Sequence, residues 1–152
     1  MKHQLRSVWS DYLQPMLKRP DRVQFAALCY DKDGPDRKIL LITSRGTGRW
    51  ILPKGWPIDG LDSPGAALQE AWEEAGVREG RPSPEPIGSF GYDKGLPGEW
   101  SVPVTTLVYP VRVVKLAEDY PEAHERQRRW VTPAEAAGMV DEPELQHILA
   151  TF

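Results

Sequence analysis

Proline and glycine interrupt this chain at short intervals from one end to the other. The 152 residues include 15 Pro and 13 Gly, and these are spread along the sequence rather than gathered in one segment. Because both residues break regular elements, this spacing predicts many short strands and helices joined by sharp turns. The length is normal for one hydrophobic core, so we expect a single domain over residues 1–152.

Apolar segments rich in β-branched residues predict strands between these turns. The predicted strands cover residues 23–30, 38–44, 49–52, 85–92, 102–114 and 128–131. Helices are predicted over residues 8–17 and 64–75, from a capping box at Thr132 to Gly138, and from Pro143 onward. Strands and helices intermix without regular alternation. The predicted class is therefore α/β, an α/β/α sandwich with a mixed β-sheet between helices.

Two prolines limit the long predicted strand over residues 102–114. Proline lacks the N–H group that a sheet requires, so Pro103 and Pro110 are expected at strand ends or edges.

The helix over residues 64–75 has the clearest boundaries in the sequence. Ser63 is a natural N-cap, and Pro64 suits the first helical position. Gly76 stands where a left-handed C-terminal cap is expected. The preceding residues, 54–62, are expected to form a loop.

Three carboxylates of this helix, Glu70, Glu73 and Glu74, fall within one arc of a helical wheel. The opposite side, expected to pack on the sheet, carries Leu68, Ala71, Trp72 and Ala75. Like charges at this spacing repel, and a cation with oxygen ligands, Mg²⁺ or Mn²⁺, would relieve the repulsion. A solvated acidic face is the common alternative. The preceding loop favours the metal site, because Gly55 lets the backbone approach a ligand closely.

The segment from Gly55 to Val77 resembles the sequence box of the Nudix hydrolase family. In that box a glycine and a glutamate precede Arg-Glu, an aliphatic residue, Glu-Glu, a glycine and a second aliphatic residue at fixed intervals. This chain matches the box in register at Gly55, Glu70, Ala71, Glu73, Glu74, Gly76 and Val77. The order of the surrounding strands also looks like the family's, so the resemblance implies a Nudix-type fold.

Two box positions depart from the family pattern. Leu61 stands where the family has Glu, and Gln69 stands where it has Arg. In the family these two residues usually pair and brace the loop against the helix. The loss of both partners together can be close to neutral, whereas the loss of one leaves an unpaired charge. We interpret the change as a rebuilt structural brace rather than an inactive site.

The resemblance implies that water attacks a diphosphate linkage, with Mg²⁺ or Mn²⁺ as cofactor. It assigns metal binding to the Gly55 carbonyl and to Glu70, Glu73 and Glu74, with Glu73 or Glu70 as the catalytic base. A dication neutralises the charge of two linked phosphates and lowers the pKa of water. A carboxylate then accepts the remaining proton.

Within that family, several segments look similar to the diphosphoinositol polyphosphate and diadenosine polyphosphate phosphohydrolases, while the loop around Gly55 looks more like bacterial members. Those segments are residues 25–30, 39–45, 49–53, 116–120 and 128–130. The candidate substrate-binding residues are Arg22, Ser44, Arg45, Arg49, Lys54, Trp56, Arg126 and Arg128. For the basic residues the alternative is a solubilising surface charge, and for Trp56 it is loop packing. Gln24 stands where the animal enzymes carry a basic residue, which weakens the inositol interpretation.

Charge and cysteine content exclude other classes. The chain has 19 Lys and Arg against 22 Asp and Glu, and the net charge of −3 argues against a nucleic-acid partner. No apolar run approaches the roughly 20 residues that cross a bilayer. Cys29, the single cysteine, lies in an apolar run and is predicted to be buried. We expect a cytoplasmic protein with a small-molecule diphosphate substrate and no membrane partner.

Two other functions stay open at this point. One is a catalytically weak binding module that senses a nucleotide or phosphorylated metabolite. The other is a pyrophosphatase for nucleotide sugars or RNA ends. The N-terminal segment and exposed tryptophans are compatible with a homodimer.

Overall fold

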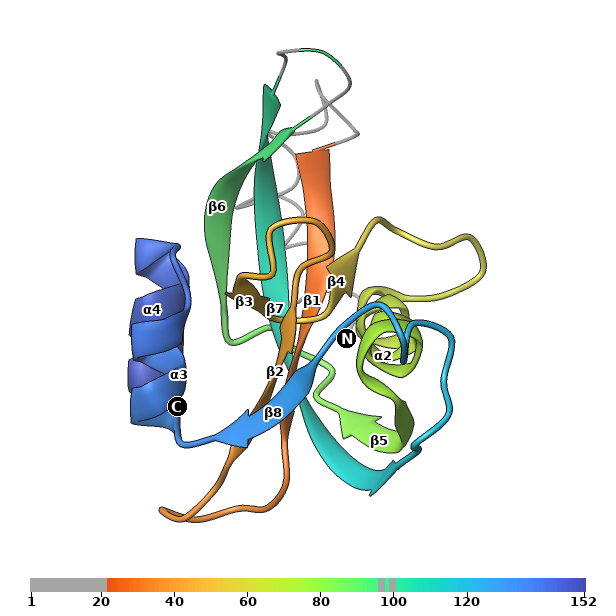
Figure 1. Cartoon of the computed structure of the whole chain (residues 1–152), viewed down its shortest axis with the longest axis vertical. Helices are drawn as coiled ribbons and strands as arrows, with labels where there is room; N and C mark the ends of the chain where they lie inside the picture. The colour runs from red at the N-terminus through yellow and green to blue at the C-terminus, as the bar shows by residue number, and fades with distance from the viewer. Residues whose placement is uncertain (1–21, 96–97, 99–100) are drawn as a thin grey trace.

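The computed structural model describes residues 22–95, 98 and 101–152 (Figure 1). The strands are β1 (Val23–Tyr30), β2 (Ile39–Thr43), β3 (Trp50–Ile51), β4 (Lys54–Gly55), β5 (Val77–Pro82), β6 (Gly88–Gly95), β7 (Ser101–Leu116) and β8 (Arg128–Val131). The helices are α2 (Ser63–Ala75), α3 (Pro133–Met139) and α4 (Pro143–Ala150). The helix predicted over residues 8–17 lies outside the described residues. None of the helices in the described ranges is long and apolar enough to cross a bilayer.

The strands form one mixed sheet, as predicted. The order along the sheet is β3-β2-β1-β7-β5, and β4 pairs with β1, β6 with β7 and β8 with β2. Strands β1 and β7 run parallel over the whole of β1, from Val23 opposite Thr105 to Tyr30 opposite Arg112. The other pairs are antiparallel.

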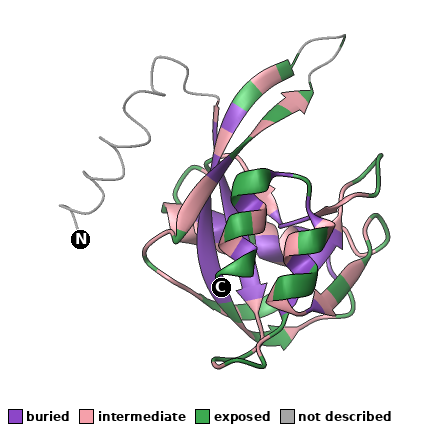
Figure 2. Ribbon diagram, turned by 90° about the vertical axis from the view of Figure 1, so that its left-hand side faces the viewer, coloured by how far each residue is buried: buried purple, intermediate pink, exposed green. Residues whose placement is uncertain are grey.

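Helices cover both faces of the sheet (Figure 1). The side chains of β1 alternate between the two layers, as a strand requires. Phe25 and Ala27 pack in the cluster that includes α2, and Ala26 and Leu28 pack in the cluster that includes α3 and α4. In Figure 2 the buried segments lie in the centre of the molecule and exposed ones follow the outer sides of the helices. Cys29 is buried as predicted, and burial raises the pKa of its thiol to about 12.

Two strands were not predicted from the sequence. Strand β4 is only two residues long, and it pairs Lys54 and Gly55 with Ala26 and Phe25. Strand β5 has the polar sequence VREGRP and pairs with the second half of β7, with two register shifts. Neither segment shows alternating hydrophobicity, because partners distant in the sequence supply the pairing.

The expectation for Pro110 was wrong. Pro110 is buried inside β7 rather than at an end or edge of that strand. It lies at a change of partners, because β6 pairs with β7 up to Val108 and β5 pairs from Val111 onward. The missing N–H therefore falls where the sheet changes partners.

The ends of α2 fix the direction of its carboxylates. The N-cap is Asp62 rather than the expected Ser63, and its carboxylate accepts a hydrogen bond from the Gly65 N–H at 2.8 Å. At the other end, Gly76 adopts the predicted left-handed conformation, with φ 75°. The predicted capping box of α3, formed by Thr132 and Glu135, is also confirmed.

Candidate active site

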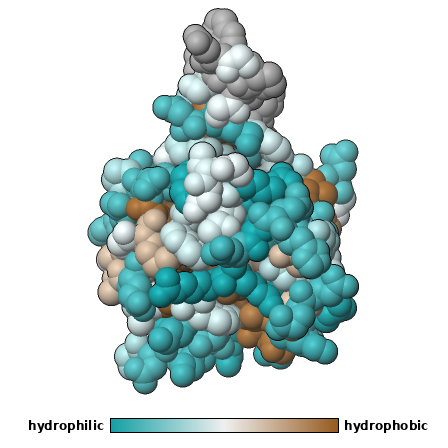
Figure 3. Space-filling model, viewed as in Figure 1, coloured by the Kyte–Doolittle hydropathy of each residue, from teal (hydrophilic) through white to brown (hydrophobic). Residues whose placement is uncertain are grey.

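The acidic side chains of α2 meet the loop after β3 at a cleft of about 610 Å³. The cleft gathers predicted residues from separate segments of the chain, namely Ser44, Arg45, Arg49, Lys54, Gly55, Trp56, Glu70 and Glu74. Arg126 also lines it, whereas Glu73, Arg22 and Arg128 do not. The molecular face drawn in Figure 3 is mostly hydrophilic, with small separate apolar patches.

Gly55 lets the Glu70 carboxyl group lie directly against the backbone of β4. A Cβ atom at position 55 would overlap that carboxyl group. The pairing of Gly55 with Phe25 holds this backbone segment to the sheet. The absence of a side chain at Gly55 therefore leaves room for the Glu70 carboxyl group against the backbone of β4.

Glu70 and Glu74 contact each other one helical turn apart. Burial raises the pKa of Glu74 well above the usual carboxyl range, and the hydrogen bond that protonated Glu74 donates to the Glu70 carboxylate acts in the same direction. Burial also raises the pKa of Glu70. Two carboxyl groups this close do not both ionise without compensation, so the pair favours a proton or a cation.

The helical wheel placed the three glutamates opposite the packing face of α2, but Glu74 is buried and only 5% exposed. Ala71 and Ala75 are buried as expected, but Leu68 and Trp72 are half-buried. The face of α2 toward the sheet consists of small alanines, so the helix packs closely and carries Glu74 into the interior edge of the cleft. Trp72 lies at the outer side, where the Arg78 guanidinium is 5.1 Å from its ring centre.

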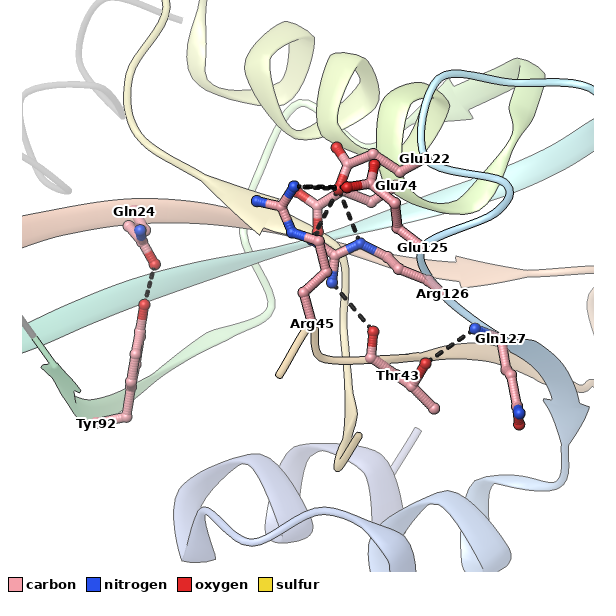
Figure 4. A network of polar contacts seen from close by, with 9 residues as sticks. All are labelled: Gln24, Thr43, Arg45, Glu74, Tyr92, Glu122, Glu125, Arg126 and Gln127. Atoms are coloured by element: carbon pink, nitrogen blue, oxygen red, sulfur yellow. Dashed lines mark hydrogen bonds and ion pairs between the residues drawn. The ribbon is translucent and has the colours of Figure 1, made fainter. Parts of the chain in front are cut away.

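Arg126 links the carboxylates of α2 to the rest of the cleft (Figure 4). Its Nη2 lies 3.5 Å from Glu74 Oε1 and 2.9 Å from Glu122 Oε1. Its Nε donates to the same Glu122 oxygen at 3.0 Å, and its Nη1 donates to the Thr43 carbonyl at 3.1 Å. The Arg126 side chain is 8% exposed, so these contacts are shielded from water.

Glu73 does not line the cleft, but its backbone positions the loop that carries Glu122. The Glu122 N–H donates to the Glu73 carbonyl at 3.0 Å. This backbone contact joins the end of α2 to the segment before β8. Glu122 lines the cleft as a result, although the sequence analysis did not single it out. No signal in the local sequence distinguishes Glu122 from a surface acid, because only the tertiary fold places it beside Glu74.

The opposite wall of the cleft combines amine, phenol and amide groups. Lys54 Nζ lies 5.0 Å from the centre of the Tyr92 ring. Burial lowers the pKa of Lys54 to about 8. The Tyr92 hydroxyl donates to Gln24 Oε1, and Gln24 is itself buried. Tyr92 was not predicted as a site residue, since a tyrosine in a strand commonly serves packing.

A second lysine that lines the cleft lies over an aromatic ring. Lys94 Nζ is 5.9 Å from the centre of the Trp56 ring. Neither Lys94 nor Lys54 makes an ion pair in the part of the chain that the structure describes. These amines are therefore free to meet an anionic ligand.

Four of the predicted arginines, Arg45, Arg49, Arg126 and Arg128, in contrast, already have partners. Arg45 lies 3.3 Å from Glu125, and Arg49 lies 2.9 Å from Glu142. Arg128 donates to the Ala75 carbonyl at 2.9 Å, so it satisfies the C-terminal end of α2 outside the cleft.

Comparison with known proteins identifies the family of this chain. A family model described as NUDIX domain matches residues 20–152. The chain belongs to the Nudix hydrolase family. This Nudix domain is 32% identical over 108 residues to human diphosphoinositol polyphosphate phosphohydrolase 3-alpha, and the match covers 69% of this chain and 60% of that protein. It is 30% identical over 107 residues to the mouse diphosphoinositol polyphosphate phosphohydrolase 2, with 69% of this chain and 55% of that protein covered. The chain thus matches little more than half the length of these relatives.

Solved structures share the fold. The crystal structure of the C. elegans Ap4A hydrolase superposes with a TM-score of 0.62 at 19% identity, covering 87% of this chain and 96% of that one. A NUDIX hydrolase from Nitrosomonas europaea gives a TM-score of 0.60 at 20% identity, with 86% of each chain covered. These similarities confirm the predicted α/β architecture.

The donor set of this Nudix domain fits a hard dication. Glu70, Glu74 and the Gly55 backbone offer only oxygen ligands, the kind that Mg²⁺ and Mn²⁺ prefer. The space that a Cβ at Gly55 would fill is taken up by a carboxyl group. Within the described ranges, no three His, Cys, Asp or Glu side chains gather in a metal-holding geometry. Arg126 instead lies between Glu74 and Glu122.

Proposed function

We propose that this Nudix domain hydrolyses a diphosphate linkage in a phosphorylated small molecule, with Mg²⁺ or Mn²⁺ as cofactor. The observation that carries the proposal is the Glu70–Glu74 pair, held against the Gly55 backbone at the end of a cleft with two free lysines. A dication there supplies charge neutralisation for the phosphates and acidifies water. Glu70, Glu74 and the Gly55 carbonyl would hold that dication, and Glu73 is the further predicted ligand.

The residues around the Glu70–Glu74 pair have different roles in the proposed reaction. A carboxylate of α2 accepts the proton of the attacking water, and Glu70 is better exposed to the cleft than Glu74. Lys54 and Lys94 bind phosphate oxygens on the opposite wall. Lys54 has a lowered pKa, so it is also able to give a proton to the departing phosphate near neutral pH.

For the substrate, we favour a dinucleoside polyphosphate over a diphosphoinositol polyphosphate. Arg45 and Arg49 are engaged by carboxylates, and Gln24 adds no charge. A densely phosphorylated ring would need more free cations than the two lysines. The rings of Trp56 and Tyr92 line the same cleft and offer flat surfaces for a base.

A substrate panel tests both levels of the proposal. Phosphate or nucleotide release is measured from diadenosine polyphosphates, diphosphoinositol polyphosphates and nucleotide sugars, with Mg²⁺, with Mn²⁺ and with excess chelator. We expect metal-dependent turnover that is fastest for a dinucleoside polyphosphate. Turnover of the inositol compounds alone overturns the substrate choice, and no metal-dependent turnover of any compound overturns the proposed reaction.

The alternative of a binding module without turnover has one observation in its favour. The Arg126 guanidinium contacts Glu74, so a cation of the protein itself already neutralises part of the acidic pair. Binding of panel compounds by calorimetry without hydrolysis would support that alternative.

A further inference from the structure

We propose that Arg126 is a positioning residue that weakens the binding of a free divalent cation and thereby couples metal binding to substrate binding. In the absence of substrate, its guanidinium holds Glu74 and opposes a second positive charge. A bound diphosphate offsets that charge, and the cation is then retained. This inference rests on the proposed metal-dependent function.

The contacts of Arg126 are unequal, and the inequality gives Glu74 freedom to change partners. Glu122 accepts two contacts from Arg126, at 2.9 and 3.0 Å, whereas Glu74 lies farther away, at 3.5 Å. The Thr43 carbonyl adds a third anchor at 3.1 Å. Arg126 therefore stays in place when Glu74 turns to a cation.

Glu122 is itself held without help from Glu74. Its N–H donates to the Glu73 carbonyl at 3.0 Å, and Arg45 Nη1 lies 3.6 Å from its carboxylate. The Arg126–Glu122 pair thus forms a fixed support beside the acidic pair of α2 (Figure 4). This arrangement differs from a mobile surface arginine, since the Arg126 side chain is only 8% exposed.

The positive charge of Arg126 is expected to lower the affinity of the site for a divalent cation. A fixed positive charge in direct contact with one metal ligand raises the free energy of a bound dication, and burial reduces the screening by water. A diphosphate carries several negative charges into the same cleft, which Arg126 lines. It is attracted to the guanidinium and to the cation together, so substrate and metal bind with positive coupling.

The test measures binding of Mn²⁺ alone, by calorimetry or by the electron paramagnetic resonance of free Mn²⁺, with and without methylenediphosphonate. In the unmodified protein we expect the diphosphonate to tighten Mn²⁺ binding by roughly fivefold or more. In Arg126→Gln, we expect Mn²⁺ alone to bind about fivefold tighter and the diphosphonate to add less. A residue with a purely structural role would instead weaken Mn²⁺ binding when replaced.

Two variants serve as controls. Arg126→Lys keeps the charge and is expected to retain the Mn²⁺ affinity of the unmodified protein. Arg45→Gln removes a guanidinium that contacts Glu122 and Glu125 but not Glu74, so we expect a smaller change than in Arg126→Gln. Circular dichroism melts check that each variant is folded.

The outcomes separate this inference from the function on which it rests. Unchanged or weaker Mn²⁺ binding in folded Arg126→Gln overturns the role of Arg126. If that variant does not fold, the unmodified protein still decides, because equal Mn²⁺ affinity with and without the diphosphonate overturns the coupling. Absence of Mn²⁺ binding under both conditions overturns the proposed metal-dependent function as well.

Discussion

The two sides of helix α2 differ in charge: the side toward the cleft is acidic, and the outer side has uncharged residues at two positions of the Nudix box. The cleft side carries Glu70 and Glu74, which are partly or fully buried and match the Nudix box. The outer side borders a shallow groove of about 430 Å³, where Leu61 and Gln69 replace the usual charged pair. Leu61 is 46% exposed and Gln69 is also exposed.

The difference between the sides follows from the energetics of ion pairs. An exposed ion pair contributes little to stability, typically about 0–1 kcal/mol, so its loss from the outer side is readily tolerated. A buried carboxyl pair destabilises the fold unless a proton or cation compensates it. The buried carboxyl pair therefore requires a proton or a cation, whereas the fold does not depend on a charged pair at the exposed position.

Replacement of Glu74 by Gln, on the cleft side of α2, is expected to have the largest effect on turnover. The change keeps the shape of the side chain but removes a charged metal ligand, and we expect metal-dependent turnover to fall by about a hundredfold or more. Steady-state kinetics over a range of Mg²⁺ concentrations measures it. Glu73→Gln is the matched variant, and we expect a smaller loss because Glu73 does not line the cleft. Equal losses in the two variants would show that burial of Glu74 in the cleft gives it no special role in metal binding.

The next largest effect is expected from filling the space beside Gly55, where the Glu70 carboxyl group lies against the backbone. In Gly55→Ala the new Cβ overlaps the Glu70 carboxyl group, the flexible end of a side chain, which moves aside. We expect weaker Mn²⁺ binding, by about tenfold or more, with a small change in melting temperature. Gly91→Ala is the control, because a Cβ there meets only an ordinary contact with the Val104 carbonyl. A large loss of stability without loss of Mn²⁺ affinity would contradict the role of Gly55 in placing Glu70 for metal binding.

The pH dependence of stability sharpens the contrast between buried and exposed carboxylates. Because the pKa of Glu74 is raised in the fold, its contribution to stability is largest at acidic pH and is lost as pH rises toward that pKa. In excess chelator we expect the melting temperature to fall between about pH 5 and pH 8, and to fall less in Glu74→Gln. A melting temperature with the same pH profile in both proteins would show that Glu74 does not cause the loss.

The outer side is tested by restoring the usual charges. Leu61→Glu introduces an unpaired charge at an exposed position, and we expect a loss of no more than about 0.5 kcal/mol in the free energy of unfolding. The double variant Leu61→Glu with Gln69→Arg should recover part of that loss. Urea unfolding measures both. Equal stability of the single and double variants would mean that no brace between these positions exists.

The N-cap of α2 is Asp62 in the structure, whereas the sequence predicted Ser63. Asp62→Ala removes the hydrogen bond to Gly65 and is expected to cost about 1 kcal/mol in the free energy of unfolding. Asp62→Asn keeps a capping oxygen and should cost less. If Asp62→Ala has no effect on the urea midpoint, Asp62 is not the effective cap.

The local sequence determined much of this protein. The apolar runs of β1 and β2, the capping box of α3 and the left-handed glycine after α2 each depend on short-range preferences. The spacing from Gly55 to Glu74 identified the family because a loop, a helix and their carboxylates lie in one continuous segment. Burial of Cys29 followed from its apolar neighbours in the same way.

The tertiary structure decided what distant segments do together. Strand β5 exists because β7 is long enough to pair with it, and Pro110 is tolerated at the point where β7 changes partners. Glu74 is buried because the alanine face of α2 packs closely on the sheet, and no wheel shows how deep a helix lies. Glu122 and Arg126 reach Glu74 only through the fold, because charge and burial at the cleft depend on contacts between residues far apart in the chain.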